Sequence, residues 1–183
     1  MFIQTENTPN PATLKFLPGC AVMDSGTANF TEASEAGHSP LAQVLFGTEG
    51  VTGVFLGSDF ITVTKSGDKE WDVLKPLILG AIMDHFQSGR PVIEGSGDEA
   101  VESTDGDDSV TSQIRELIDT RVRPAVAQDG GDIVYKGFED GVVYLHMQGA
   151  CAGCPSSTAT LKHGIENMLR YYVPEVTEVR AVE

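Results

Sequence analysis

The sequence predicts an α+β fold made of two small domains joined by an acidic, flexible linker. The chain has 183 residues, more than the ~150 of a typical single domain, and its hydrophobic (40%) and charged (21%) fractions fit globular material. One stretch, "SGRPVIEGSGDEAVESTDGDDS" at 88–109, is rich in Gly, Ser, Asp and Glu, with Arg90 as its only basic residue. Such a segment buries too little apolar surface to offset its ordering entropy. We therefore expect domains over 1–90 and 110–183, with a linker over 91–109.

The first domain begins with strand and turn signals. We expect short strands at Phe2–Gln4 and Thr13–Leu17, separated by the turn dipeptide Asn10-Pro11. Ser39 followed by Pro40 is typical of an N-cap with proline at the first helical position, so a helix is expected from there through Phe46.

A hairpin and a second helix complete the first domain. The segment "VTGVFLGSDFITVTK" has two β-rich runs around Gly57-Ser58-Asp59. Apolar residues then recur at helical spacing, namely Trp71, Leu74, Ile78, Ala81, Ile82 and Phe86. Pro76 must lie in the early part of this helix or kink it.

The second domain is expected to have the order helix–strand–strand–helix–strand. Its first helix is marked by the apolar residues Ile114, Leu117, Ile118, Val122, Ala125 and Val126. We expect Pro124 to bend or fray this helix and Gly130-Gly131 to end it. The strands "DIVYKGF" and "GVVYLHMQG" flank a hairpin turn at 139–141. Pro155 begins the second helix, Pro174 ends it, and "EVTEVRAV" supplies the last strand.

Two of the three cysteines, Cys151 and Cys154, lie in the loop between the second strand and the second helix. With Pro155 at the first helical position, Cys154 is expected at or near the N-cap. Unsatisfied backbone N–H groups and the positive end of the helix dipole favour a thiolate there. Only Ala152 and Gly153 separate the two cysteines, so little bulk prevents both sulfurs from turning to one side.

Four interpretations of this cysteine pair remain open from spacing alone. In the first, the pair is a thiol–disulfide redox site, although no βαβ pattern of the thioredoxin type precedes it. In the second, the pair is half of a zinc site that a dimer completes with four thiolates. In the third, it is half of an iron–sulfur cluster site, since a cluster takes four thiolates and this motif supplies two. Alternatively, both cysteines are small hydrophobic residues at a helix entry.

The region around the pair resembles the C-terminal domain of the NifU/Nfu family. The matching motifs are Arg123-Pro124, Asp129-Gly130-Gly131-Asp132, the run from Gly149 to Ser157 ("GACAGCPSS"), and Thr160-Leu161-Lys162. The first domain resembles the Nfu N-terminal domain through "FIQTENTPNPATLKFLPG" and "WDVLKPLILGAIMDHFQSGRPV". Together the two resemblances cover nearly all of the chain outside the linker.

This resemblance implies an iron–sulfur cluster carrier or scaffold rather than an enzyme. It implies a labile [4Fe–4S] cluster bound between two protomers by Cys151 and Cys154 of each and transferred to apo-proteins. The implied partners are a second copy of the chain, recipient apo iron–sulfur proteins and an upstream assembly scaffold. No catalytic Ser/His/Asp arrangement, Gly-rich phosphate loop or carboxylate pair accompanies the motif.

Other chemically active side chains have simpler expected roles. Cys20, in the first domain, matches no ligand position, so we expect a bystander thiol. His146 and His163 are expected to be packed or exposed rather than ligands. We interpret Asp129 and Asp132, which flank the glycine pair, as capping and turn residues. Ser156, Ser157 and Thr158 either donate hydrogen bonds to cluster sulfurs or cap the helix backbone.

Charge and the first residues suggest further exclusions. A net charge of −15 is repelled by phosphate backbones and anionic lipid surfaces, so nucleic acid and membranes are not expected partners. The segment "MFIQTENTPNPATLKF" has neither a signal-peptide pattern nor an Arg-rich composition. We therefore expect a bacterial cytoplasm, with the mitochondrial matrix as the alternative if a presequence has been removed.

Overall fold

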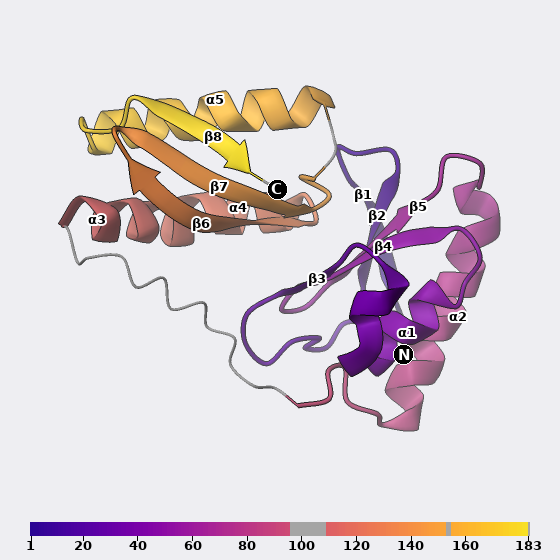
Figure 1. Ribbon diagram of the computed structural model, residues 1–183. Coiled ribbons are helices and arrows are strands. Elements are labelled where there is room, and N and C mark those ends of the chain that lie inside the picture. Colours follow the sequence, from indigo (N-terminus) through magenta and orange to yellow (C-terminus); the bar gives the residue numbers. More distant parts are fainter. Residues whose placement is uncertain (96–108, 153–154, 183) are drawn as a thin grey trace. The chain divides into compact units, whose positions relative to one another are not determined.

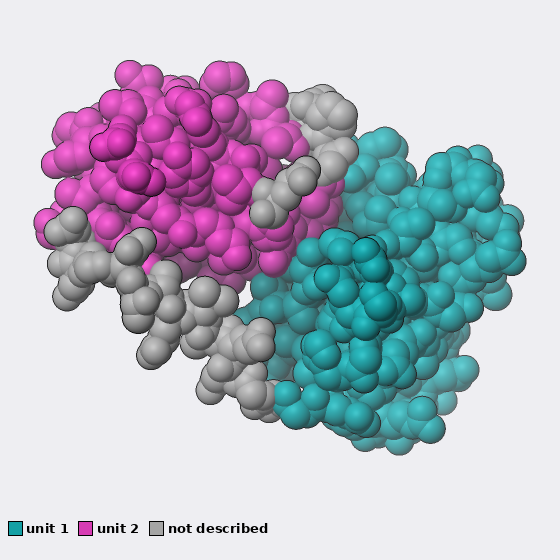
Figure 2. Space-filling view, viewed as in Figure 1, with its two compact units in different colours: residues 1–98 teal, residues 99–183 magenta. Residues whose placement is uncertain are grey.

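The computed structural model divides into two compact units, residues 1–98 (unit 1) and 99–183 (unit 2), each with its own core (Figures 1 and 2). The structure describes residues 1–95, 109–152 and 155–182, with the backbone alone at 155–157. Most of the linker expected over 91–109 lies outside the described residues. Both units mix helices with strands, which confirms the predicted α+β class.

Unit 1 is a five-stranded antiparallel sheet with helices packed against one face (Figure 1). The strand order is β1-β2-β5-β4-β3, and the strands are β1 Gln4–Asn7, β2 Thr13–Leu17, β3 Ala28–Phe30, β4 Val51–Leu56 and β5 Ile61–Lys65. The helices are the 3₁₀ segment η1 Ala33–His38, α1 Pro40–Phe46 and α2 Trp71–Ser88. Strand β1 begins at Gln4 instead of Phe2, and β3 and η1 are not predicted from the sequence.

The helix signals of unit 1 are confirmed in detail. The hydroxyl of Ser39 accepts a hydrogen bond from Ala42 N, as an N-cap does, and Pro40 opens α1. Helix α2 continues through Pro76, its sixth residue, and ends at Gly89 in the left-handed conformation (φ +67°).

Residues 92–94, which follow α2, bond to and pack against the rest of unit 1. Ser39 Oγ donates to Val92 O at 2.7 Å, and Glu94 N donates to His38 O at 2.7 Å. Val92 and Ile93 also pack against the core of unit 1. These contacts hold residues that composition alone assigns to the linker.

Unit 2 has the predicted order, with three strands and helices that share one core (Figure 1). Strands β6 Gly131–Glu139 and β7 Val142–Gly149 are antiparallel, and β8 Glu178–Val182 is parallel to β7. The two-residue turn between β6 and β7 is Asp140-Gly141, and both residues have positive φ (52° and 80°). The helices are α3 Ser109–Leu117, the π-helical segment η2 Ile118–Val122, α4 Arg123–Gln128 and α5 Pro155–Tyr172.

The π-helical segment explains how one apolar stripe spans three consecutive helical segments. The buried residues recur at intervals of four, namely Ile114, Ile118, Val122 and Val126. In a regular α-helix of 3.6 residues per turn this spacing would rotate steadily away from the core. In η2 the N–H of Arg123 donates to the carbonyl of Ile118, five residues back, and this wider turn restores the alignment. The helix continues past Pro124 to Gln128 and so ends just before Gly130-Gly131, where the sequence predicts its end.

Candidate functional site

The cysteine loop, residues 150–154, connects the end of β7 to the start of α5. The chain turns into this loop at Gly149, which has φ +64°. Cys151 lies on the described part of the loop, whereas Cys154 and its predicted N-cap position lie outside the described residues. Helix α5 begins at Pro155, as predicted. The loop therefore leads directly into the N-terminus of an 18-residue helix, where the helix dipole favours anionic groups.

Hydrogen bonds attach the described part of the loop to its surroundings. Ala150 N donates to Gly130 O at 3.1 Å, which joins the loop to the turn before β6. Ala152 N donates to Gly149 O, also at 3.1 Å. The hydroxyl of Thr158, on the first turns of α5, donates to Cys151 O at 3.3 Å. Of the two roles considered for Thr158, this contact is of the backbone-bonding kind.

Cys151 is buried rather than presented to solvent. Only 6% of the residue is exposed, and it belongs to the hydrophobic core of unit 2. Its neighbour across the loop is Gly131, the first residue of β6. A Cβ atom at Gly131 would lie 2.5 Å from Cys151 Sγ and 2.8 Å from Gln148 O, closer than van der Waals contact permits. This contact is not apparent from the sequence, because it depends on a glycine that only the strand register Gly131↔Gly149 brings next to the loop.

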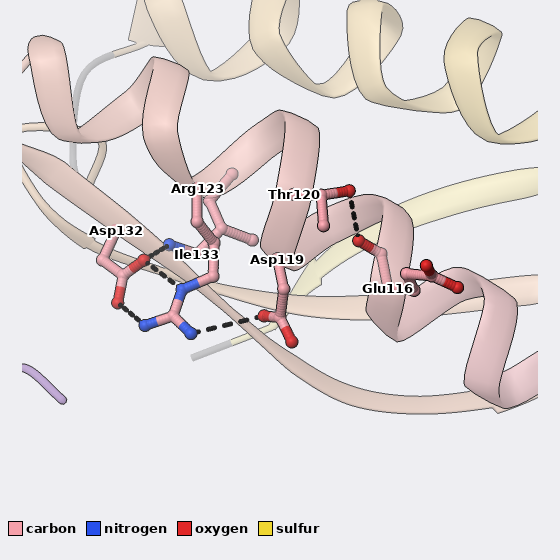
Figure 3. A network of polar contacts seen from close by, with 6 residues as sticks. All are labelled: Glu116, Asp119, Thr120, Arg123, Asp132 and Ile133. Carbon is pink, nitrogen blue, oxygen red and sulfur yellow. Dashed lines mark hydrogen bonds and ion pairs between the residues drawn. The ribbon is translucent and has the colours of Figure 1, made fainter. Parts of the chain in front are cut away.

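An ion pair fixes the start of β6 next to this contact (Figure 3). Asp132, which is 4% exposed, accepts hydrogen bonds from Arg123 Nε at 2.9 Å and Nη2 at 3.0 Å and from Ile133 N at 2.8 Å. Arg123 also donates to Asp119 at 3.3 Å. The hydrogen bonds from Arg123 to Asp132 raise the pKa of Arg123, against the opposing effect of burial.

The interpretation of Asp132 as a capping or turn residue is therefore wrong. Its carboxylate is the buried half of an ion pair that joins α4 to β6. Asp129, in contrast, is exposed and follows α4 as its C-cap residue, as the sequence suggested.

The remaining predicted candidates belong to other parts of the chain. Cys20 is exposed in unit 1. His163 is exposed on α5, and His146 Nδ1 lies 3.0 Å from Val182 O on the neighbouring strand. The side chains of Ser156 and Ser157 lie outside what the structure describes.

The described residues offer few alternatives for binding a metal. Over 1–95, 109–152 and 155–182, no three His, Cys, Asp or Glu side chains form a group that could bind a metal ion. None of the helices in these ranges is both long and apolar enough to span a membrane.

Family comparisons match both units. The model described as "Scaffold protein Nfu/NifU N terminal" matches residues 3–89, and the model described as "NifU-like domain" matches residues 114–180. Both matches confirm the resemblance inferred from the motifs.

Relatives cover the whole chain. It is 52% identical over 183 residues to the human protein named "NFU1 iron-sulfur cluster scaffold homolog, mitochondrial", covering 100% of this chain and 72% of that protein. A Drosophila sechellia protein of the same name is 52% identical over 184 residues, and the chain spans 65% of its length. A solution NMR structure of a NifU-like protein from Saccharomyces cerevisiae is 31% identical, with a TM-score of 0.46, covering 51% of this chain and 84% of that one.

These names correct the expected location. The human and fly relatives are named mitochondrial, which contradicts the expected bacterial cytoplasm. The wrong expectation rested on the composition of the first residues, and the composition of a folded domain does not identify a compartment.

Two family models that together match most of the chain, and a relative 52% identical over all of it, lead to one conclusion. The chain belongs to the NifU/Nfu family of iron–sulfur cluster scaffold proteins.

Proposed function

We propose that two copies of this chain bind one labile [4Fe–4S] cluster through Cys151 and Cys154 of each copy and transfer it to apo-proteins. The cluster is cargo, and the chain acts as carrier or scaffold rather than as an enzyme. The observation on which this proposal depends is a CxxC motif at the N-terminus of α5 in a member of a cluster scaffold family.

The ligand count supports a bridging site. Each iron of a [4Fe–4S] cluster takes an outer ligand, and four thiolates are the usual set. The motif supplies two. The described residues contain no separate cluster of metal-binding side chains from which the others could come. A second copy of the same motif completes the set with no further protein.

Electrostatics supports the lability of such a dimer. Each chain has a net charge of −15, so two chains repel one another. The dimer is therefore held together by the shared cluster rather than by contacts between protein surfaces. Two helix N-termini facing one cluster offset part of its negative charge. A recipient that offers its own thiolates can then displace one protomer by ligand exchange.

The same charge argues against nucleic acid and anionic membranes as partners. Recipient apo-proteins and an upstream assembly scaffold are the proposed partners, and unit 1 is the proposed partner-binding module. The role of unit 1 rests on family membership alone.

Anaerobic reconstitution of the full chain with iron and sulfide tests the proposal. We expect broad visible absorbance, about four irons and four sulfides per dimer, and conversion from monomer to dimer by light scattering. Cys151→Ala and Cys154→Ala should each abolish both cluster and dimer, while the matched control Cys20→Ser keeps both. Mixing the loaded protein with an apo-enzyme that requires [4Fe–4S] should restore its activity.

The alternatives give different outcomes in the same experiment. A zinc-stabilised interaction module binds zinc and gives no visible chromophore, and a thiol redox protein cycles between dithiol and disulfide without metal. A cluster bound by a protein that stays monomeric would contradict the bridged arrangement.

A further inference from the structure

The contact between Cys151 and Gly131 has a consequence for how a cluster is loaded. The sulfur lies where a side chain of Gly131 would otherwise be, at the first residue of β6. Cys151 is 6% exposed and packs in the same core as Ile133 and Met147. We call this position of the sulfur, against Gly131, the seat.

Two bonds next to Cys151 keep the loop in this arrangement. Gly130 O accepts from Ala150 N, one residue before Cys151, and the hydroxyl of Thr158 donates to the carbonyl of Cys151 itself. The ion pair between Arg123 and Asp132 in turn fixes the strand that begins with Gly131. The seat is therefore made by the backbone of β6, and hydrogen bonds join the loop both to the turn before β6 and to helix α5.

A sulfur in this seat cannot bind a cluster shared with another chain. A bridging cluster requires each ligand sulfur to bind an iron of a cluster whose other irons are bound by the second protomer. A side chain enclosed in the core of its own unit does not satisfy that requirement. The sulfur must leave the core before it can bind.

We propose that Gly131 is a positioning residue that shelters the thiol of Cys151 in the cluster-free protein, and that Cys151 leaves this seat when a cluster is loaded. This inference rests on the proposed function for its second half only. The first half concerns the apo-protein and is tested without any cluster.

The test is the rate of alkylation by N-ethylmaleimide in the reduced, metal-free full chain, followed at each cysteine by peptide mass spectrometry. Exposed Cys20 serves as the internal reference. In the wild type, Cys151 should react at least about tenfold more slowly than Cys20, because it reacts only through local opening. In denaturant the two rates should converge.

Substitutions then locate the cause. Gly131→Ala should raise the Cys151 rate by about tenfold, because the added methyl group occupies the seat. The matched control is Gly137→Ala on the same strand, where nothing lies within 4 Å of the added Cβ, and it should leave the rate unchanged. Thr158→Val, which removes the hydroxyl bond without crowding the seat, should give a smaller rise and serves as the second variant if Gly131→Ala does not fold.

Iron content tests the second half. If release accompanies loading, folded Gly131→Ala protein should bind iron and sulfide at wild-type stoichiometry. Loss of the cluster from this folded variant would show that Cys151 binds the cluster while its sulfur is in the seat against Gly131, which overturns the proposed release. Equal rates for Cys151 and Cys20 in the wild type, or a Cys151 rate that neither Gly131→Ala nor Thr158→Val raises, would overturn the seat. A wild type that shelters Cys151 and binds no cluster would instead refute the proposed function and leave the seat intact.

Discussion

Replacing Asp132 with alanine tests the ion pair that fixes the start of β6. The carboxylate accepts hydrogen bonds from Arg123 Nε, Arg123 Nη2 and Ile133 N, and its side chain is only 5% exposed. Alanine removes all of these bonds together and leaves the guanidinium without its buried partner.

The expected cost follows from how well Arg123 can be solvated afterwards. Breaking a buried ion pair by removing one partner costs about 3–5 kcal/mol. The side chain of Arg123 is 37% exposed and keeps its contact with Asp119 at 3.3 Å, so solvent screens part of the loss. We therefore expect a loss of about 3 kcal/mol in the free energy of unfolding of unit 2, or a fall of about 10–20 °C in its melting temperature.

The aromatic residues allow each unit to be followed separately in the full chain. The single tryptophan, Trp71, lies in unit 1, and all four tyrosines (135, 144, 171 and 172) lie in unit 2. Tyrosine near-UV circular dichroism should report the destabilisation, while tryptophan fluorescence should show an unchanged transition for unit 1.

The control for this prediction is an exposed ion pair of unit 2. Glu178→Ala removes the partner of Arg180, and both side chains are largely solvated, so no measurable shift in the tyrosine transition is expected. If Asp132→Ala shifted the tyrosine transition no more than Glu178→Ala, the reasoning from burial would be refuted.

Three further predictions concern a buried histidine, a glycine with positive φ and a helix cap. Burial lowers the pKa of His85 below its ordinary 6.5, so on acidification the unfolded chain takes up a proton before the folded chain does. The free energy of unfolding of unit 1, measured by tryptophan fluorescence in urea, should therefore fall as the pH drops below 6.5. His85→Leu should weaken this pH dependence. Gly141→Ala should cost unit 2 about 1–3 kcal/mol, because φ is +80° and the added Cβ meets Thr177 Oγ1 at 2.7 Å; a tyrosine transition no lower than that of Gly137→Ala would contradict this. Ser39→Ala should cost unit 1 about 1–2 kcal/mol, since the hydroxyl both caps α1 and donates to Val92 O, and an unchanged urea midpoint would show that neither bond matters.

Much of the fold could be predicted because its signals are local. Ser39-Pro40 opens α1, and Asp140-Gly141 forms the hairpin turn, since these residue types favour those backbone conformations wherever they occur. Strand β3 could not be predicted, because three residues, Ala28–Phe30, have too little pattern and are held by pairing with β4. The attachment of Val92 to Ser39 joins residues 53 apart, and composition contains no information about such a bond.

The candidate site divides in the same way. The cysteine loop and the helix after it could be predicted from spacing and from Pro155. The burial of Cys151 could not, because it depends on Gly131, a residue far away in sequence that becomes its neighbour only through the β6–β7 register. The role of Asp132 could not be predicted for a related reason: beside two glycines it resembles a turn residue, and only the tertiary structure brings Arg123 to it.

The π-helical segment η2 also has a meaning for insertions and deletions along the chain. The buried stripe Ile114, Ile118, Val122 and Val126 has intervals of four, whereas the stripe of a regular helix alternates four with three. Removing one residue between Ile118 and Val122 would produce that alternation and leave the same apolar side chains facing the core. The segment η2 is therefore one residue longer than the apolar pattern needs, and the helix absorbs the surplus as a single wide turn. A shortened chain lacking Thr120, an exposed residue within this turn, would keep the stripe in register while losing the wide turn that precedes Pro124.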